Sequence, residues 1–289
     1  MSDWWITGDL EAFLGRAGAF LHSRPAAHTV PLTVTDALRH RGPHAFGPAD
    51  PVFGALERAG RVEAVFVRTP PWALNLTPLS GPDADALAAH LAELGHDLAG
   101  VFAAEDTAAA FAGAWQRHTG AAVRVERSQR LYRLGELTAP HPVPPGRPRV
   151  AGAQDRELIA RWFCAFAEAV GDRAPADAGA GWADARIAYG GVTLWEAPDG
   201  TPLAMAGVTR RSAGQVRVAP VYTPAELRGR GYGGAATAEV SRAARAAGAD
   251  EVLLFTDLAN PTSNALYQRL GYRPVGDFTV WAFTPPATG

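Results

Sequence analysis

Apolar residues recur at steps of three and four along the second half of the chain, a spacing typical of helices with one buried face. The longest such pattern predicts a helix over residues 155–170. Further helices are predicted over 183–189, 231–247 and 261–270, and a glycine follows each of the last two, as is common at helix ends. Short apolar runs predict strands over 192–196, 203–209, 215–222, 251–256 and 280–283.

The first half of the chain repeats much of this order. Its hydrophobic pattern predicts strands over 62–68 and 72–76, a helix over 83–94, a strand over 101–103, a helix over 107–118 and a strand over 123–134. The order strand, strand, helix, strand, helix, strand therefore occurs twice. It favours two copies of one α/β unit, and two unrelated domains of similar pattern are the alternative.

A proline-rich segment separates the two copies. Residues 140–148 contain five prolines in nine positions. Proline lacks a backbone N–H and has a fixed φ, so this segment cannot form a helix or an inner strand and is predicted to be a semi-rigid linker. We therefore expect a first domain over 1–139, a linker over 140–148 and a second domain over 149–289.

Charge excludes several kinds of chemistry. The formal net charge is −2, which gives no electrostatic reason to expect nucleic-acid binding. All 27 cationic residues are arginine, so Schiff-base lysines, lysine-containing phosphate loops and protein-kinase sites are excluded. The eight histidines end at His141, so the usual neutral-pH base is missing from the second domain. His40 and His44 do not form a helical pair, and no metal site is expected.

The remaining composition predicts a cytoplasmic protein. The single cysteine, Cys164, cannot form an intramolecular disulfide and lies in an apolar helical run, so we expect it in the core. The first residues lack a basic leader, and no uncharged apolar run approaches 18 residues, so no signal peptide and no membrane segment are expected.

The strongest chemical signal is the turn Arg228-Gly229-Arg230-Gly231-Tyr232-Gly233-Gly234, between a predicted strand and a predicted helix. Glycines let backbone N–H groups converge on one point, and the positive end of the helix dipole favours an anion such as a pyrophosphate. The string also satisfies the dinucleotide pattern G-x-G-x-x-G. That reading is weak because residues 223–227, including Pro224, separate the strand from the glycines.

These residues resemble the GCN5-related N-acetyltransferase (GNAT) superfamily. Its acetyl-coenzyme A (acetyl-CoA) loop is Arg or Gln, two residues, Gly, one residue, then Gly or Ala, matched by Arg228, Gly231 and Gly233. Residues 218–226 resemble the fourth strand of that superfamily and its exit. A second motif of the family is matched by Asn264, Tyr267, Gly271 and Tyr272.

The resemblance covers residues 150–285 and implies an α/β (α+β) fold. Each of two GNAT-like domains would be a mixed, mainly antiparallel sheet flanked by helices. Residues 77–82 of the first copy lack the loop motif and contain no arginine, and Pro82 removes an amide donor. The first copy thus resembles the degenerate partner domain of tandem acetyltransferases, unable to hold coenzyme A.

The resemblance also implies a mechanism. An amine attacks the thioester directly, the backbone N–H of Val221 stabilises the oxyanion, and the Tyr267 phenol protonates the leaving thiolate. Asn264 would bind the pantetheine arm or a strand carbonyl. The residues expected to bind acetyl-CoA are Val221, Tyr222, Thr223, Arg228, Gly229, Arg230, Gly231, Tyr232, Gly233, Gly234, Asn260, Asn264 and Tyr267.

The second domain has no histidine to deprotonate the amine, so the candidate bases are carboxylates that act directly or through a water chain. Glu196, Glu226 and Glu168 are available, and Glu196 is the first choice because it ends an apolar strand. The predicted function is an acetyl-CoA-dependent N-acetyltransferase that acts on a small-molecule amine. The alternatives are an aminoacyl-tRNA- or other acyl-CoA-dependent transferase, a non-enzymatic acyl-CoA-binding protein and a dinucleotide oxidoreductase. The sequence identifies neither the acceptor nor the oligomeric state.

Overall fold

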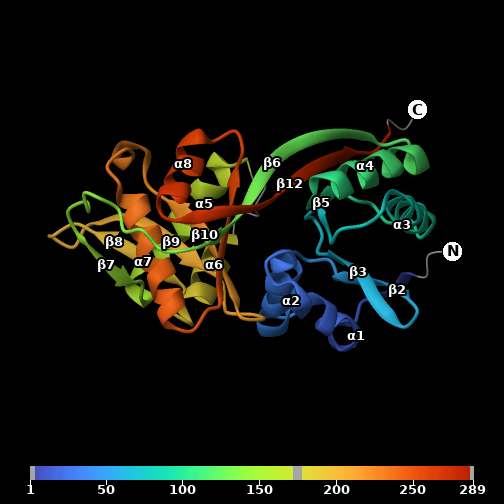
Figure 1. Cartoon of the computed structure of the whole chain (residues 1–289), viewed down its shortest axis with the longest axis horizontal. Coiled ribbons are helices and arrows are strands. Elements are labelled where there is room, and N and C mark those ends of the chain that lie inside the picture. Colours follow the sequence, from blue (N-terminus) through green and yellow to red (C-terminus); the bar gives the residue numbers. More distant parts are fainter. Residues whose placement is uncertain (1–3, 172–177, 287–289) are drawn as a thin grey trace. The chain divides into compact units, whose positions relative to one another are not determined.

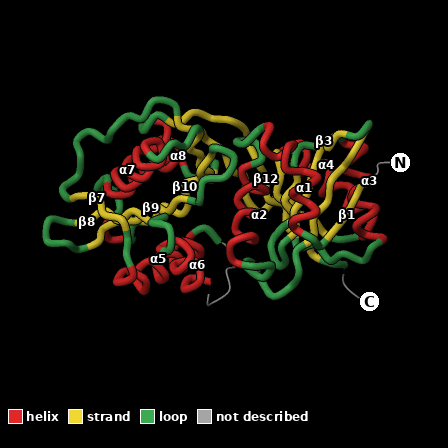
Figure 2. Tube along the Cα trace, turned by 90° about the horizontal axis from the view of Figure 1, so that it is seen from below, coloured by secondary structure: helices red, strands yellow, loops and turns green. Residues whose placement is uncertain are grey.

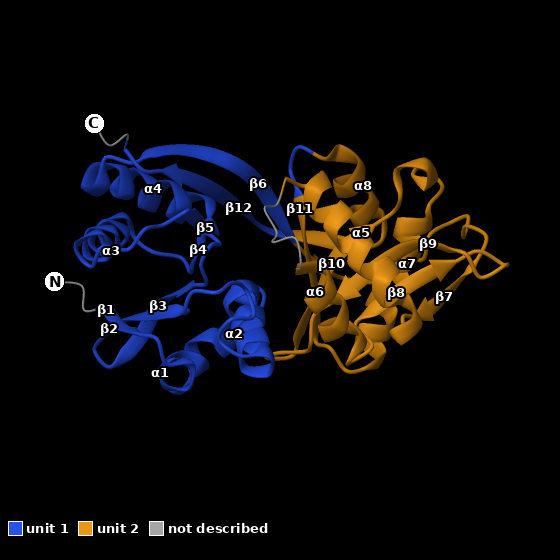
Figure 3. Ribbon diagram, turned by 180° about the vertical axis from the view of Figure 1, so that it is seen from behind, with its two compact units in different colours: residues 1–131, 257–259, 275–289 blue, residues 132–256, 260–274 orange. Residues whose placement is uncertain are grey.

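The computed structural model describes residues 4–171 and 178–286 and divides the chain into two compact units. Unit 1 comprises residues 1–131, 257–259 and 275–289, and unit 2 comprises residues 132–256 and 260–274 (Figure 3).

The two halves of the chain have the same order of elements (Figure 1). The first half forms β1 (Trp4–Thr7), α1 (Leu10–Ser23), α2 (Thr29–Arg41), β2 (Val52–Arg58), β3 (Arg61–Arg68), β4 (Leu74–Leu76), α3 (Gly81–Glu93), β5 (Gly100–Ala104), α4 (Glu105–Thr119) and β6 (Ala122–Leu134). The second forms β7 (Arg147–Val150), α5 (Arg156–Ala169), α6 (Ala178–Ile187), β8 (Val192–Glu196), β9 (Pro202–Val208), β10 (Gln215–Tyr222), α7 (Tyr232–Ala246), β11 (Glu251–Asp257), α8 (Pro261–Arg269) and β12 (Tyr272–Thr284). Two short 3₁₀ turns, η1 (Ala153–Asp155) and η2 (Ala225–Leu227), occur in the second half.

Both sheets are mixed and mainly antiparallel, which confirms the predicted fold class. In unit 1 the strand order is β1-β2-β3-β4-β5-β12-β6, and β4 pairs with β5 in parallel. In unit 2 the order from the end of β6 is β6-β11-β10-β9-β8-β7, and β10 pairs with β11 in parallel. The pairs β1–β2, β2–β3, β3–β4, β5–β12, β7–β8, β8–β9 and β9–β10 are antiparallel.

The last strand of the chain belongs mostly to unit 1. β12 pairs with β5 from Phe278 opposite Ala104 to Ala282 opposite Gly100, and it lies beside β6 (Figure 1). Phe283 is 8% exposed and stacks on Trp115 of α4 at 6.0 Å between ring centroids. The units therefore divide the chain at other residues than the predicted domains do, because residues 275–289 complete the core of unit 1.

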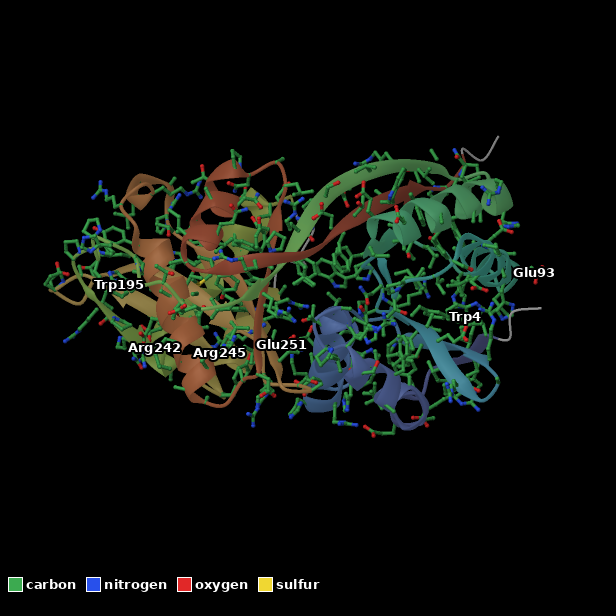
Figure 4. All side chains as sticks on the ribbon, viewed as in Figure 1. Trp4, Glu93, Trp195, Arg242, Arg245 and Glu251 are labelled. Atoms are coloured by element: carbon green, nitrogen blue, oxygen red, sulfur yellow. The ribbon has the colours of Figure 1, made fainter. Side chains whose placement is uncertain are left out.

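The end of β6 belongs to unit 2 in the same way. Arg245 of α7, labelled in Figure 4, donates to the carbonyl of Leu134 at 2.9 Å and to that of Asp250 at 3.0 Å. Arg133 forms an ion pair with Glu251 of β11 at 2.9 Å. Residues 132–139, predicted to belong to the first domain, therefore fall in unit 2.

Helices cover both faces of the unit 2 sheet (Figure 2). On one face α7 and α8 pack over alternate residues of β8 to β11, and the buried side chains there include Val216, Val218 and Tyr267. On the other face α5 and α6 pack over Val192, Leu194 and Met205. Because successive strand residues point to opposite faces, a residue's position along β10 determines which pair of helices it meets.

Several elements differ from the sequence predictions. Residues 4–58 form β1, α1, α2 and β2, none of which was predicted. The end of the predicted linker forms β7, the edge strand of the unit 2 sheet, which is a position that tolerates Pro148. Cys164 is exposed rather than buried, and its Sγ lies beside α6, where a Cβ atom on Gly179 would be 2.7 Å from it.

Candidate functional site

Strands β10 and β11 diverge in unit 2. Their parallel register contains three pairs, Gln215–Arg217 opposite Glu251–Leu253. β10 then continues to Tyr222, and its register with β9 shifts between Val218 and Val221. A strand edge without a neighbouring strand has free backbone donors and acceptors, so this divergence is a place where an extended ligand can pair with β10.

The glycine-rich turn follows β10 and begins helix α7. Gly229 and Gly231 have φ values of 77° and 85°, which glycine adopts without the steric cost of a side chain. Gly231 is the N-cap residue of α7, and no side chain caps this helix. The amides of the first helical turn, at the positive end of the dipole, are therefore not occupied by a side chain.

The next two glycines allow close packing. A Cβ atom on Gly233 would lie 3.0 Å from Oγ1 of Thr223, and one on Gly234 would lie 2.9 Å from Cδ1 of Leu266. The first turn of α7 therefore lies against the exit of β10 and against α8. This packing gives a physical reason for glycine at position 233 of the loop motif.

The two arginines of the turn are exposed and hold its backbone. Nε of Arg228 donates to the carbonyl of Thr223 at 3.0 Å, and Nη2 of Arg230 donates to the carbonyl of Glu226 at 3.3 Å. A guanidinium has five donors, so each arginine can also bind a phosphate oxygen. The turn thus combines open amides with two cationic side chains.

Tyr267 lies on α8, and its side chain is 8% exposed. Burial raises the pKa of Tyr267 to about 12, so the phenol is protonated at neutral pH. Its ring meets the ring of Tyr272 edge-on at 6.1 Å, and the Tyr272 hydroxyl lies 2.7 Å from Oγ of Ser241. Within residues 4–171 and 178–286, the Tyr267 hydroxyl has no hydrogen-bond partner, which leaves its proton available to a ligand.

Asn260 and Asn264 have structural partners. Oδ1 of Asn264 accepts from the buried Tyr132 hydroxyl at 2.9 Å, and its Nδ2 donates to the carbonyl of Asn260 at 2.8 Å. Oδ1 of Asn260 accepts from the N–H of Ser263 at 3.0 Å and so caps α8. These bonds fix the helix that carries Tyr267. The contacts predicted for both side chains with acetyl-CoA stay predictions.

Glu196, the predicted base, is held by arginine side chains. It is 4% exposed, and its carboxylate accepts from Nε of Arg149 at 2.6 Å and lies 3.7 Å from Nε of Arg147. Arg149 also donates to both carboxylate oxygens of Asp155, at 2.7 and 2.9 Å. This network lies at the β7–β8 edge, two strands from β10, or about 10 Å at the usual strand spacing.

A base must reach the reacting amine directly or through one water, and Glu196 is already held by arginines on the α5 side of the sheet. These contacts give Glu196 a structural role, and its assignment as the base stays a prediction. Glu226 and Glu168, the other two carboxylates considered, are exposed on η2 and α5. Val221, Tyr222 and Thr223 are half-buried at the exit of β10.

A group of aromatic side chains on the α5–α6 face was not predicted from the sequence. Trp162 of α5 meets Tyr222 at 5.9 Å, and Phe163 stacks on Trp182 of α6 at 4.8 Å. All four are half-buried and pack around Met205 and its neighbours. The helical spacing of Trp162 and Phe163 indicated burial, but it gave no sign that their rings reach the exit of β10.

Four other tryptophans lie elsewhere. Trp4, labelled in Figure 4, and Trp5 line a cavity of about 480 Å³ in unit 1. The indole N–H of Trp72 donates to the carbonyl of Phe46, and that of Trp195 donates to the carbonyl of Pro145. Trp182, by contrast, packs over β9 of unit 2, where a Cβ atom on Gly207 would lie 3.1 Å from its ring.

Within residues 4–171 and 178–286, no group of three or more His, Cys, Asp or Glu side chains is arranged to hold a metal ion. Over the same residues, no helix has the length and hydropathy needed to cross a membrane.

Residues 157–272 match the family model of the acetyltransferase (GNAT) family. No curated protein sequence matches the chain. Among solved structures, a GCN5-related N-acetyltransferase from Sphaerobacter thermophilus is 16% identical, with a TM-score of 0.63. The alignment covers 99% of this chain and 97% of that structure. A GNAT-family acetyltransferase from Colwellia psychrerythraea is 13% identical, with a TM-score of 0.59 and coverages of 97% and 98%. A tandem GNAT protein from the clavulanic acid biosynthesis pathway is 14% identical, with a TM-score of 0.58 and coverages of 99% and 100%.

Proposed function

Because residues 157–272 match the GNAT family model and the fold resembles that of a tandem GNAT protein, we propose that the chain is a tandem GNAT protein whose unit 2 transfers an acetyl group from acetyl-CoA to the amine of a small molecule. The family implies acyl-CoA-dependent acyl transfer, and the proposal adds the acetyl donor and the class of acceptor. The observation that supports it best is the uncapped, glycine-rich first turn of α7 beside the divergence of β10 and β11.

The residues present fit acetyl-CoA. The open amides of residues 229–234, with Arg228 and Arg230, would bind the pyrophosphate. The free edge of β10 from Val221 to Thr223 would pair with the amides of the pantetheine arm. That path places the thioester at the divergence of the strands. When bound, acetyl-CoA supplies the electrophilic thioester carbonyl.

Transfer proceeds in two bond changes. The amine nitrogen forms a bond to the thioester carbon, and the N–H of Val221 donates to the resulting oxyanion. The carbon–sulfur bond then breaks, and the hydroxyl of Tyr267 donates to the departing thiolate. Because burial raises the pKa of Tyr267 to about 12, hydrogen bonding to sulfur is favoured over leaving a buried phenolate. Any proton that Tyr267 gives up returns from the proton lost by the amine.

No side chain of unit 2 is assigned as the base. Glu196 is ion-paired with Arg149, and the second half of the chain beyond His141 has no histidine. The amine therefore binds neutral or loses its proton to water. A protonated amine has no lone pair and cannot attack the thioester. We therefore expect kcat/KM to rise with pH until the acceptor amine is mostly neutral.

The loop assignment is tested by Gly231→Asp. A carboxylate at the N-cap of α7 would occupy the open amides and repel a pyrophosphate, so calorimetry should show no acetyl-CoA binding. Gly200→Asp is the matched control, because Gly200 also has a positive φ (89°) and a Cβ there would have open space. Unchanged affinity in Gly231→Asp would remove the loop from the proposal.

Catalysis is tested separately by thiol release from acetyl-CoA over a panel of amines. Release that depends on an added amine identifies a transferase. Acetyl-CoA binding without release for any amine would instead identify a binding protein.

A further inference from the structure

Arg217 is a half-buried arginine whose guanidinium has no partner in the part of the chain that the structure describes. It lies on β10 between Val216 and Val218, whose side chains pack on the α7 face, so its own side chain is directed to the α5–α6 face. Its Nη1 is buried and has no hydrogen-bond partner. Over residues 4–171 and 178–286, its guanidinium forms no ion pair and no hydrogen bond.

The surroundings of Arg217 are unfavourable for a lone cation. Burial and, to a smaller extent, the nearby positive charge of Arg186 on α6 together lower the pKa of Arg217 to about 10. Buried arginines in folded proteins are nearly always paired with an anion or fully hydrogen-bonded. An arginine that stays unpaired in the protein alone is therefore a strong indication of an anionic ligand.

Arg186 cannot supply what Arg217 lacks, because both are cations. Arg186 is itself held by α6 and β9: its Nη1 donates to the carbonyl of Val208 and to the hydroxyl of Tyr189. Its guanidinium also lies 5.3 Å from the ring centre of Trp182. The position of Arg186 is thus fixed, and it adds positive potential beside Arg217 rather than neutralising it.

Arg217 also lies at a particular place along β10. It is the last residue of β10 that pairs with β11, so the divergence of the two strands begins at its position. On the same face, Trp182 packs over the next part of the sheet, where a Cβ on Gly207 would lie 3.1 Å from its ring and 2.7 Å from the Ala219 carbonyl. Tyr222 and Trp162 follow at the exit of β10. The α5–α6 face therefore presents a cation at the root of the divergence and aromatic rings beyond it.

We propose that Arg217 binds a carboxylate of the acceptor, so that the acceptor is an amine that also carries a carboxylate, as an amino acid does. This inference rests on the proposed function, because the acceptor is the molecule that receives the acetyl group. A carboxylate fits because a planar guanidinium binds it through two parallel hydrogen bonds. The half-buried rings of Trp182 and Tyr222 provide apolar surface for the remainder of the molecule, and aromatic faces also attract an ammonium group.

The test measures binding of matched pairs that differ only in the acidic group. The probes are phenylalanine with phenethylamine, leucine with isopentylamine, and phosphoethanolamine as an amine with a phosphate. Binding is followed by the thermal midpoint of the intact chain and by tryptophan fluorescence, with and without acetyl-CoA. We expect the amino acids to bind and the decarboxylated amines to bind at least about tenfold more weakly, since a charge-assisted pair is lost.

Arg217→Gln should remove this preference. The dissociation constant of the amino acids should rise at least about tenfold, while that of the decarboxylated amines stays unchanged. Arg217→Lys keeps the positive charge but not the planar guanidinium. Its dissociation constant for the amino acids should therefore lie between those of the unchanged chain and of Arg217→Gln. Arg211→Gln is the control: this exposed arginine donates to the carbonyl of Gly248 at 2.7 Å, and its loss should leave the preference intact.

The thermal midpoint of unfolding is a second readout, and it distinguishes a ligand-binding arginine from one that stabilises the fold. Because Arg217→Gln removes an unpaired buried charge, its thermal midpoint without ligand should equal or exceed that of the unchanged chain. Arg149→Gln, which breaks ion pairs with Asp155 and Glu196, should lower it. A lowered midpoint in Arg217→Gln, equal binding of acids and amines, binding of the phosphate probe alone, or no amino acid bound would each overturn the proposal.

Failure of this inference is distinguishable from failure of the proposed function. If acetyl transfer is wrong, no amine causes thiol release, yet carboxylate binding without acetyl-CoA still depends on Arg217. If the carboxylate assignment is wrong, added amines still cause thiol release, but Arg217→Gln leaves the KM and kcat of the amino acids unchanged.

Discussion

The helices α3 and α7 occupy the same place in the repeated order of elements, yet a side chain caps the first turn of α3 and none caps that of α7. The first turn of α7 begins at Gly231 and has no side-chain cap. In α3, Oγ of Ser80 caps the N–H of Asp83, and the Asp83 carboxylate accepts from the Ser80 hydroxyl at 2.6 Å. The α3 turn therefore contains an anion of the chain itself, whereas the first turn of α7 contains no acidic residue, as the proposed binding of a pyrophosphate requires.

The strands before these helices differ in the same sense. β10 extends five residues beyond its pairing with β11, whereas β4 has only three residues and pairs with β5 through Leu74 and Asn75. After β4, the hydroxyl of Thr77 accepts from the N–H of Val65 at 2.8 Å, and the N–H of Leu79 donates to Thr107 at 3.1 Å. Internal bonds thus use the groups that an extended ligand would need. The comparison supports the proposal that the first copy has lost coenzyme A binding and kept the fold.

The largest expected effect concerns the strand that closes unit 1. Phe283→Ala removes a ring packed against Trp115 and Phe111, and it should lower the free energy of unfolding by about 4 kcal/mol. Val275→Ala, in the same strand but 42% exposed, should have a small effect. Urea unfolding measures both. Equal losses would mean that residues 275–284 do not complete the core of unit 1.

The second effect concerns the chemistry of unit 2. Tyr267→Phe removes the proposed donor to the leaving sulfur and should reduce kcat about 100-fold, with acetyl-CoA affinity unchanged. Because the hydroxyl has no hydrogen-bond partner among residues 4–171 and 178–286, stability should not change. Steady-state kinetics and calorimetry on the same preparation test this. Turnover equal to that of the unchanged enzyme would remove Tyr267 from the mechanism.

A third prediction separates the two helix starts. Asp83→Ala removes a carboxylate that is 5% exposed and bonded to Ser80, and it should cost about 2 kcal/mol of unfolding free energy. Acetyl-CoA affinity should stay the same, since the ligand is assigned to α7. Asp85→Ala, which breaks the exposed pair with Arg117, is the control and should cost less. A parallel loss of acetyl-CoA binding in Asp83→Ala would contradict the assignment of roles.

The smallest effect concerns acid stability in unit 2. Hydrogen bonds from Arg149 hold the pKa of Asp155 below its usual value near 3.8. A lowered carboxyl pKa stabilises the fold above the unfolded pKa, and this stabilisation is lost as the pH falls through the folded value. The unfolding free energy should therefore fall below about pH 4, and less steeply in Arg149→Gln. Identical pH slopes for the two proteins would contradict the pairing.

Local features of the sequence predicted much of unit 2. The helix and strand over 261–270 and 215–222 follow from apolar spacing and turn residues, and the structure has them at Pro261–Arg269 and Gln215–Tyr222. The position of the glycine turn was also predictable, because positive φ and close packing leave few residue types other than glycine. Helix α2 was not predictable in this way, since its sequence TVPLTVTDALRHR contains β-branched residues and a proline that oppose helix formation locally. It is held by buried side chains such as Leu32 and Leu38.

Long-range partners explain the remaining differences. Glu196 lies at the end of an apolar strand, which the sequence shows. Its pairing with Arg149, 47 positions earlier, arises because β7 lies beside β8, and local spacing does not determine that strand pairing. β12 was predicted as a strand of four residues, although it spans Tyr272–Thr284, because its polar positions gain their pairing from β5 of the first half. The unpaired state of Arg217 likewise depends on the helices folded over it, which sequence spacing does not determine.

The most direct measurement of the central claim is the stoichiometry of acetyl-CoA binding to the full chain by isothermal titration calorimetry. The contrast between α7 and α3 predicts one molecule per chain and none for Gly231→Asp, with Gly200→Asp binding as the unchanged chain does. Two molecules per chain, or one molecule still bound by Gly231→Asp, would contradict it.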